Sequence, residues 1–527
     1  MENQEEEPEA ILVNPINGKI EAVGTLEQVE AVSGNCVHKE DLGGKCLMPA
    51  FIDAHSHITM NAQMALCADL STCKTFDDII KNLKDYIDSK KIQKAQAVIG
   101  FGYDHNFLLE QEHPNRYVLD EVSRDIPVMI LHISGHLACV NSITLELAGI
   151  TKDTPNPSGG LIGRGLDGKE PNGYLEEAGI PIVQEVVQSR LMIDRAAMLE
   201  QMQATYIEHG VTTVQDGATT AGDLMLLKEI AKAKLLKVDV VAYPLMTAGG
   251  EILLRDNRDM IRKYQEHLKI GGYKLVLDGS PQGRSAWMSK PYLEGPKGYC
   301  GYPWLEDHVV KKYVKQAVEE GQQLLAHCNG DAASEQYLEA YEEAIEDSNR
   351  ADKLNLRPVM IHCQTVRNDQ LDRMAKLNMI ASVFVGHVWY WGDIHLKNFG
   401  MERGNHISPV RDAMKRGITV NFHQDTPVTK PDMLHSVWCA VARRSRNGMI
   451  IGDEQKVSVF EALKAVTINA AYQYFEENDK GSIKTGKRAD LIILDRSPLE
   501  VSLDEIKDIQ VLQTLKDGEV IFKKEQY

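Results

Sequence analysis

The sequence predicts an α/β fold: a (β/α)8 TIM barrel with a large insertion after strand 1 and a small β-sandwich-like domain formed by both termini. Three observations support this. Short apolar runs alternate with helical stretches, one long gap follows the first run, and both ends of the chain contain strand-like segments. The 527 residues suffice for a barrel of about 250 residues or more with accessory parts.

Eight short apolar and β-branched segments are the expected barrel strands. They lie at residues 47–55, 211–216, 238–244, 273–278, 323–327, 359–362, 380–385 and 418–425. Helical stretches separate them, which predicts parallel strands joined by helical crossovers. In a parallel barrel the carboxyl ends of all strands lie on one face, and active sites form there.

A gap of about 150 residues separates the first two strands, which is far longer than an ordinary connection. We therefore expect an inserted subdomain at about residues 95–180, covering the active site. Residues 96–106 and 126–141 predict strands, and the glycine-rich residues 156–174 predict hairpins and turns. The glycines of this stretch are spaced like a dinucleotide-binding loop, but no helix with an apolar face follows directly, so turns are the better interpretation.

The two ends of the chain predict one composite domain. Residues 1–49 and 480–527 contain strand-like segments with turn residues, whereas residues 459–475 read as helical. We therefore assign the small β domain to these two terminal segments and the barrel to residues 50–479.

Composition excludes several classes of partner. The formal net charge of −18 would repel a phosphate backbone, so we do not expect nucleic acid to bind. No apolar run reaches the roughly 20 residues of a membrane span, and the first residues lack the features of a secretory signal, which together favour a cytoplasmic location. The nine cysteines include no Cys-x-x-Cys pair and fit reduced thiols, so a metal would need other ligands.

Histidines at strand ends give the strongest functional signal. His55 and His57, in PAFIDAHSHIT, are two residues apart on a strand and face the same side, so both imidazoles can bind one cation. An isolated pair of this kind is a weak signal, because one histidine often caps a core strand while the other is exposed. Other predicted strands end in similar residues: His327 in LLAHCNG, His362 in VMIHCQ, and His423 and Asp425 in NFHQD. This convergence predicts a metal site.

Eight motifs occur in order along almost the whole chain: AFIDAHSH, SGHLACVNS, GGLIGR, KLVLDGS, AHCNGD, IHCQ, FHQD and GSIKTGKRADLIILD. On these motifs the chain resembles the amidohydrolase superfamily, specifically the YtcJ-like group (amidohydrolase family 3) that includes N-substituted formamide deformylases. The resemblance implies a metal-dependent hydrolase with one or two divalent ions per chain, of which zinc is the expected metal.

Carried over residue by residue, the resemblance implies that His55, His57, His327 and His362 bind metal and that Asp425 stands beside them as a further ligand. Asp425 would then act as a proton shuttle. It would accept a proton from the metal-activated water and deliver it to the leaving nitrogen.

Two residues compete as a bridge between two metal ions. Lys274 lies at strand four, where many relatives carry a carboxylated lysine, and addition of CO2 would turn its cation into an anionic ligand. Its alternative is an ion pair with Asp278 or Glu176. Glu176 follows the glycine-rich segment, as a glutamate does in relatives, and its alternative is a solvated helix position. With neither bridge, the site would be mononuclear.

Four further residues are candidates for substrate contacts. His136, in SGHLACVN, is expected to bind substrate or stabilise an oxyanion, with a buried structural role as the alternative. His387 and Trp389, in GHVWYWGD, follow strand seven and are expected to line the pocket or to belong to the core. His423 alternates to the same side as Asp425, which makes it a substrate contact, an extra ligand or a hydrogen-bond donor to a ligand.

The resulting function is hydrolysis of a non-peptide carbon–nitrogen bond in a small amide, formamide or cyclic amide. The same site in the superfamily also serves ring deamination and ester or lactone hydrolysis, and fold and metal do not separate these reactions. A regulatory homologue without turnover is a third alternative, disfavoured because the five metal-site residues are all present. The expected partner is a small-molecule substrate, and the resemblance is compatible with a homodimer.

Overall fold

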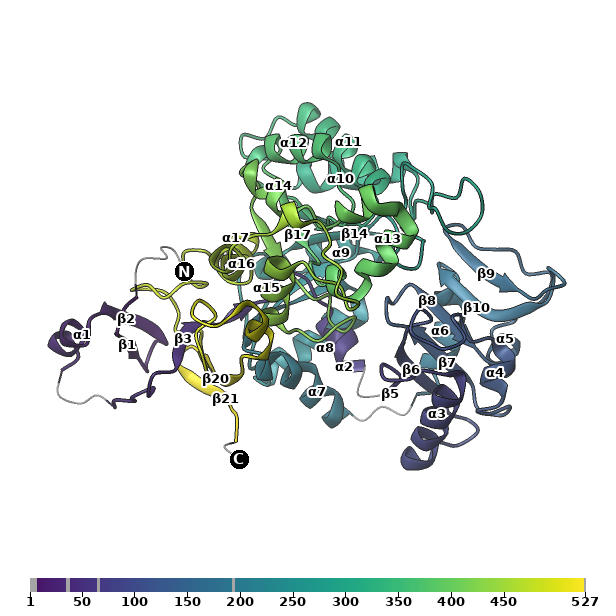
Figure 1. Ribbon diagram of the computed structural model, residues 1–527, viewed down its shortest axis with the longest axis horizontal. Coiled ribbons are helices and arrows are strands. Elements are labelled where there is room, and N and C mark those ends of the chain that lie inside the picture. Colours follow the sequence, from purple (N-terminus) through teal and green to yellow (C-terminus); the bar gives the residue numbers. More distant parts are fainter. Residues whose placement is uncertain (1–6, 35–37, 64–66, 192–194, 526–527) are drawn as a thin grey trace.

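The computed structural model describes residues 7–34, 38–63, 67–191 and 195–525. Its chain forms three regions in a row along the longest axis: β-structure from both termini, a central α/β region, and an inserted sheet (Figure 1). The α/β class predicted from the sequence is present in the central region.

The centre contains two parallel sheets, with strand orders β13-β12-β11-β4 and β14-β15-β16-β17-β18. Their bounds are β4 (Phe51–Ile52), β11 (Val211–Thr219), β12 (Asp239–Pro244), β13 (Leu268–Ile270), β14 (Gly272–Val276), β15 (Gln323–Cys328), β16 (Val359–His362), β17 (Ile380–Val383) and β18 (Val420–Phe422). Only Gly271 separates β13 from β14, and a Cβ there would lie 2.3 Å from the Tyr243 ring. The chain therefore passes from one sheet to the other at a position that only glycine fits.

The two sheets contact each other at both edges. Leu245, just after β12, pairs in parallel with Lys274 of β14. Beyond the opposite edge strands, the His57 N–H donates to the Thr426 carbonyl over 2.8 Å.

Alternating side chains along the strands of the two central sheets point to two different hydrophobic clusters. Val241 and Ile361 point to an inner cluster that draws on both sheets and is capped by Tyr474. Their neighbours Val240 and Met360 belong to the main outer cluster, which includes the helices. This is the period-two pattern of strands covered on both faces.

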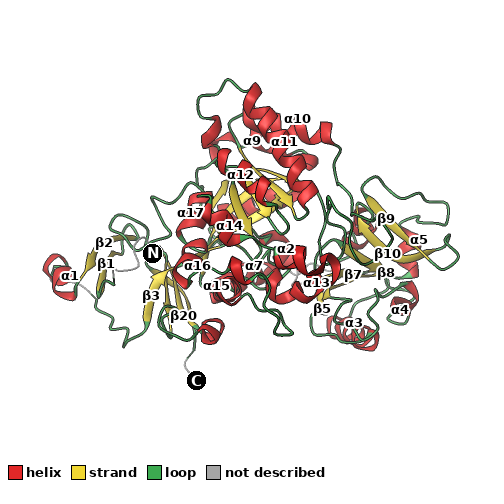
Figure 2. Cartoon of the chain, turned by 45° about the horizontal axis from the view of Figure 1, so that its top comes forward, coloured by secondary structure: helices red, strands yellow, loops and turns green. Residues whose placement is uncertain are grey.

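Helices surround the central sheets (Figure 2). They are α2 (Ile58–Gln63), α7 (Arg195–Glu208), α8 (Ala221–Lys232), α9 (Gly250–Asp256), α10 (Asp307–Glu319), α11 (Asp331–Asp347), α12 (Asn368–Lys376), α13 (His387–Asn405), α14 (Val410–Lys415), α15 (Met433–Ala442), α16 (Val459–Ala465) and α17 (Ile468–Gln473). Within the described part of the chain, none of the helices has the length and apolarity needed to cross a membrane.

The first predicted strand is divided between two sheets. β3 (Cys46–Pro49) pairs antiparallel with β19 (Leu491–Leu494), and only β4 pairs with β11. The Ala50 N–H donates to the Asp490 carbonyl and the Phe51 N–H to the Gly210 carbonyl, each over 2.9 Å. The expectation of one strand over residues 47–55 was therefore wrong, because the chain changes partner between these two residues.

The insertion is a six-stranded sheet of order β5-β6-β7-β8-β10-β9. Its elements are β5 (Cys67–Asp69), α3 (Phe76–Lys90), β6 (Val98–Tyr103), α4 (Arg116–Asp120), β7 (Val128–His132), β8 (Leu137–Val140), α5 (Ser142–Leu147), β9 (Gly160–Arg164), β10 (Pro171–Glu177) and α6 (Ile180–Gln188). The sheet begins at Cys67, earlier than the expected residue 95, because β5 pairs with β6. Ile79 and Leu83 of α3 also pack in this sheet's core, against Val128.

Segments from both ends of the chain form the third region. β3 joins β19, β20 (Val511–Lys516) and β21 (Glu519–Lys523) in a four-stranded antiparallel sheet. β1 (Ala10–Asn14) and β2 (Lys19–Gly24) form a hairpin that is followed by α1 (Leu26–Val32). Ile20 of the hairpin packs against Leu491 of the larger sheet, so the two terminal segments share a small core.

Candidate metal centre

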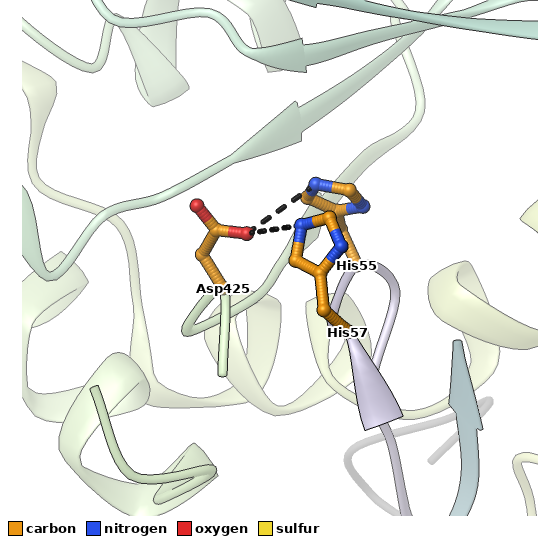
Figure 3. Close-up of side chains that lie close together, drawn as sticks. All are labelled: His55, His57 and Asp425. Atoms are coloured by element: carbon orange, nitrogen blue, oxygen red, sulfur yellow. Dashed lines mark ion pairs between the residues drawn. The ribbon is translucent and has the colours of Figure 1, made fainter. Parts of the chain in front are cut away.

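His55, His57 and Asp425 come together beyond the carboxyl ends of β4 and β18 (Figure 3). Asp425 Oδ1 lies 3.4 Å from His55 Nε2 and 3.3 Å from His57 Nε2. The three ligand atoms all lie within 4.8 Å of one another. In a tetrahedral zinc site with bonds of about 2.0–2.2 Å, two ligand atoms lie about 3.3–3.6 Å apart. The two measured distances therefore fit a small divalent cation.

The orientation of the His55 ring is fixed from behind by Gln215 on β11. Gln215 Nε2 donates to the Ala54 carbonyl over 2.9 Å, so its Oε1 must be the atom that faces His55 Nδ1, at 2.5 Å. His55 therefore donates through Nδ1–H and keeps a lone pair on Nε2. A hydrogen bond from one ring nitrogen of a histidine sets the tautomer in which the other nitrogen can bind a metal ion.

His362 and His327 lie on the other side of Asp425. His362 Nε2 is 3.9 Å from Asp425 Oδ2 and 3.0 Å from His327 Nδ1. The two oxygens of Asp425 thus face different histidines, with Oδ1 toward His55 and His57 and Oδ2 toward His362. The five residues expected to bind metal from the four strand ends are brought together.

Asp425 is ionised, and its side chain is 13% exposed. Burial raises its pKa, but the contact with His57 and the nearby His362 outweigh burial and hold the pKa well below its usual range. Asp425 Oδ1 is buried without a hydrogen-bond partner among the described residues. A buried anionic oxygen in this state is costly, and a cation at this position would satisfy it.

Two of these residues have backbone conformations that favour glycine. His362 has a φ of 77° and Asp425 a φ of 54°, both in the left-handed region. This region costs other residues roughly 1–3 kcal/mol, and such strain is typical of functional sites. It occurs where the two side chains enter the cluster, with His362 as the last residue of β16 and Asp425 just beyond β18.

Lys274 on β14 is buried beside the cluster. Its Nζ lies 3.3 Å from His55 Nε2, and burial lowers its pKa to about 8. Within the described part of the chain it pairs with neither alternative partner. Asp278 instead accepts hydrogen bonds from the backbone N–H groups of Asn329 and Gly330, at 3.0 and 2.7 Å.

Glu176 is not part of the cluster. Its carboxylate accepts hydrogen bonds from the Tyr174 and Tyr302 hydroxyls, each at 2.9 Å. Successive residues of a strand face opposite sides, and at the end of β10 it is Glu177 that faces the site. The expectation that Glu176 bridges two metals is therefore corrected: the structure directs it away.

Glu177 holds His136 near the histidine cluster. Glu177 Oε2 lies 2.9 Å from His136 Nδ1, and the His136 and His327 ring centroids are 5.2 Å apart. Burial lowers the pKa of His136, but the charge of Glu177 outweighs it and raises the pKa overall. Glu177 also approaches Gly279 so closely that a Cβ at this glycine would lie 2.2 Å from its Oε1.

The expected substrate residues lie in different surroundings. His423 Nε2 is 3.2 Å from His362 Nδ1 and its Nδ1 is 3.0 Å from Ser382 Oγ, so it supports a histidine of the cluster. His387 is buried, with Nδ1 3.0 Å from His395 Nε2. Trp389 packs away from the cluster against Trp438 of α15, with ring centroids 5.1 Å apart.

Two residues that position histidines of the site, Gln215 and Glu177, were not predicted from the sequence. Gln215 is a neutral amide inside a strand, and only its place beside His55 reveals its role. Glu177 directly follows a residue that was considered, so the signal was present in the pair of glutamates. What was missing was the register that decides which of the two faces the site.

The chain matches the model of the amidohydrolase family over residues 40–522. It is similar to the N-substituted formamide deformylase of Arthrobacter pascens, with 29% identity over 98% of this chain and 95% of that protein. It is also similar to the protein YtcJ of Bacillus subtilis (strain 168), with 25% identity over 98% of this chain and 96% of that protein.

A solved structure is also similar to this chain over most of its length. An uncharacterized metal-dependent hydrolase from Pyrococcus horikoshii OT3 is similar at 26% identity and a TM-score of 0.72, covering 92% of this chain and 94% of that one. The family match spans most of the chain and confirms the resemblance to YtcJ-like proteins that the motifs predicted. The chain belongs to the amidohydrolase family and is a hydrolytic enzyme.

Proposed function

We propose that the protein hydrolyses a non-peptide carbon–nitrogen bond in a small amide, formamide or cyclic amide, using a divalent metal ion of the zinc type. The ion would be held by His55, His57 and Asp425, with His327 and His362 as further ligands. The observation that carries this proposal is the buried Asp425 Oδ1, 3.3–3.4 Å from two imidazole nitrogens. The similarity to a formamide deformylase supports the choice of bond.

When bound, a divalent ion lowers the pKa of water and polarises the substrate carbonyl. Asp425, ionised and 13% exposed, accepts the proton of the attacking water and delivers it to the leaving nitrogen. His136, whose pKa is raised by Glu177, donates a hydrogen bond to the carbonyl oxygen as negative charge develops there. His57 is 20% exposed, so substrate approaches from its side.

We further infer that Lys274 is carboxylated and bridges two ions. Only a neutral amine adds CO2, and a pKa of about 8 makes the neutral form accessible near physiological pH. The contact between Lys274 and His55 at 3.3 Å fits an anionic bridge better than a cation beside metal ligands. The two Asp425 oxygens face different histidines, Oδ1 toward His57 and Oδ2 toward His362, which also supports two ions.

Metal analysis tests the number of ions and the role of Lys274. We expect two equivalents per chain at this centre in protein purified without chelator, falling to about one in Lys274→Ala, apart from any ion bound elsewhere in the chain. One equivalent at this centre that Lys274→Ala leaves unchanged would mean a mononuclear site with a structural Lys274. Absence of metal from both proteins would contradict the proposed function.

Product analysis tests the reaction. With N-substituted formamides as substrates, we expect release of an amine with formate, and a loss of about 10²–10⁴-fold in kcat for Asp425→Asn. Release of ammonia alone would instead identify a deaminase, and turnover confined to esters or lactones would identify the other alternative. Unchanged turnover in Asp425→Asn would contradict the assigned proton shuttle.

We also propose that the two central sheets together form the (β/α)8 barrel, with its residues at 50–479, and that residues 1–49 and 480–527 form one domain. Support comes from the inner cluster shared by both sheets and from their contacts at both edges. The pairing of β3 with β19 supports the composite terminal domain.

A further inference from the structure

A second group of possible metal ligands lies in the inserted sheet, outside the centre described above. Asp104 and His105 follow β6, and His132 ends β7. Their ligand atoms all lie within 4.8 Å of one another. Asp104 and His132 are buried, and the His105 side chain is 13% exposed. We propose that Asp104, His105 and His132 form a second metal site in this enzyme, which holds a zinc ion within the insertion.

The distances within the group carry this proposal. His132 Nε2 lies 3.3 Å from both Asp104 Oδ1 and His105 Nδ1. These separations equal the spacing of about 3.3–3.6 Å between two ligand atoms of tetrahedral zinc. The third distance, from His105 Nδ1 to Asp104 Oδ1, is 3.8 Å and needs only a small rotation of the partly exposed His105 ring.

Histidine–carboxylate hydrogen bonds elsewhere in the same molecule are shorter. His267 Nδ1 lies 2.7 Å from Asp239 Oδ1, and His136 Nδ1 lies 2.9 Å from Glu177 Oε2. The Asp104–His132 distance of 3.3 Å differs from both and equals the 3.3 Å between His57 and Asp425 in the candidate metal centre. The group thus has the spacing of ligands around an ion.

The surroundings of the three residues suit a metal site. Trp391 of α13 donates from Nε1 to Asp104 Oδ2 over 3.1 Å, which leaves Oδ1 as the oxygen that faces the histidines. Ser134 Oγ lies 2.9 Å from His132 Nδ1 and can accept its proton, so that Nε2 keeps the lone pair. Partners that orient the ligands in this way are typical of metal sites.

The competing account is a cluster held by hydrogen bonds alone. The Ser134 N–H, 3.1 Å from His132 Nδ1, favours the opposite tautomer, in which His132 Nε2–H donates to Asp104. Asp104 Oδ1 also accepts hydrogen bonds from the backbone N–H and the side-chain amide of Asn106, each at 2.9 Å. In this account no ion binds.

An ion at this position would connect the insertion to the catalytic region. α13 lies beside the inserted sheet in both views (Figures 1 and 2), and its Trp391 contacts Asp104. Ser134, which contacts His132, accepts a hydrogen bond from the His136 N–H at 3.3 Å. The bound ion would therefore fix the segment that presents His136 to the first centre.

Zinc content of full-length protein tests the proposal. We expect His105→Ala to lose one zinc equivalent per chain, while His57→Ala, a change in the first centre, retains the zinc of the insertion. The matched control is His113→Ala, because His113 stacks on His105 at 3.9 Å but its Nδ1 is taken by the Tyr103 hydroxyl at 3.1 Å. His113→Ala should keep the wild-type zinc content. Zinc content in His105→Ala equal to that of the wild type would overturn the proposal.

Anomalous scattering from wild-type crystals grown with zinc gives an answer that does not depend on any variant folding. We expect a zinc peak between Asp104 Oδ1, His105 Nδ1 and His132 Nε2, separate from any peak at His55 and His57. A map with zinc in the first centre and none in the insertion would establish the hydrogen-bonded cluster instead. Zinc in the insertion alone would support this proposal and contradict the proposed function.

Discussion

Gln215 Oε1 lies 2.5 Å from His55 Nδ1 and fixes which nitrogen of that ring is free to bind a metal ion. Gln215 is itself held by the Ala54 carbonyl and the Tyr474 hydroxyl, so its amide cannot rotate to suit another tautomer. The His55 nitrogen that would bind a metal ion under the proposed function is therefore set by Gln215, which is not itself one of the proposed ligands.

We expect Gln215→Leu to weaken metal binding about 10–100-fold, because His55 then loses the acceptor that fixes its Nδ1 proton. The measurement is competition with a chelator of known affinity. Gln473→Leu is the matched control, since Gln473 Nε2 donates to the same Ala54 carbonyl over 2.6 Å. Equal weakening in both variants would show that general disruption of this buried region, and not the tautomer of His55, is responsible.

The pair formed by Glu177 and His136 predicts a shift in pH dependence. The charge of Glu177 raises the pKa of His136. If protonated His136 stabilises the oxyanion, activity is present below this pKa and is lost as the pH rises through it. Glu177→Gln removes the charge, so the alkaline limb of kcat/KM should move to lower pH.

Glu176→Gln is the matched control for this experiment, because the adjacent glutamate binds Tyr174 and Tyr302 on the opposite side of the strand. It should leave the alkaline limb in place. A limb that Glu177→Gln does not move would remove His136 from the proposed mechanism.

Strand positions could be predicted from the sequence because apolar runs and their spacing are local features. The division of residues 47–55 could not, because it depends on Leu491 of β19, which pairs with Pro49 from a distant part of the chain. In contrast, the meeting of His55, His57 and Asp425 could be predicted, because the strand ends of a parallel sheet share one face. The choice between Glu176 and Glu177 depends on register at the end of β10, which a pair of identical neighbours does not specify.

The buried charge cluster around Asp239 predicts how stability depends on pH. Asp239 pairs with Lys480 and lies 3.1 Å from Lys516 Nζ and 2.7 Å from His267 Nδ1. Burial raises the pKa of Asp239, but Lys480 and Lys516 outweigh burial and hold the pKa well below its usual range. A depressed carboxyl pKa contributes stability that is present above the unfolded value of about 3.9 and is lost as the pH falls toward the folded value.

We expect Asp239→Asn to lower the free energy of unfolding by about 3–5 kcal/mol at pH 7, because it leaves two buried lysines with fewer charge partners. The difference from the wild type should stay constant from about pH 5 to 8 and shrink below about pH 4, where the unfolded wild type binds a proton at Asp239 that the folded protein does not. Thermal unfolding monitored across this pH range measures it. Asp85→Asn, which breaks the exposed pair with Lys81, should change the midpoint at no pH. A wild-type advantage that grows as the pH falls would show that Asp239 is protonated in the folded protein.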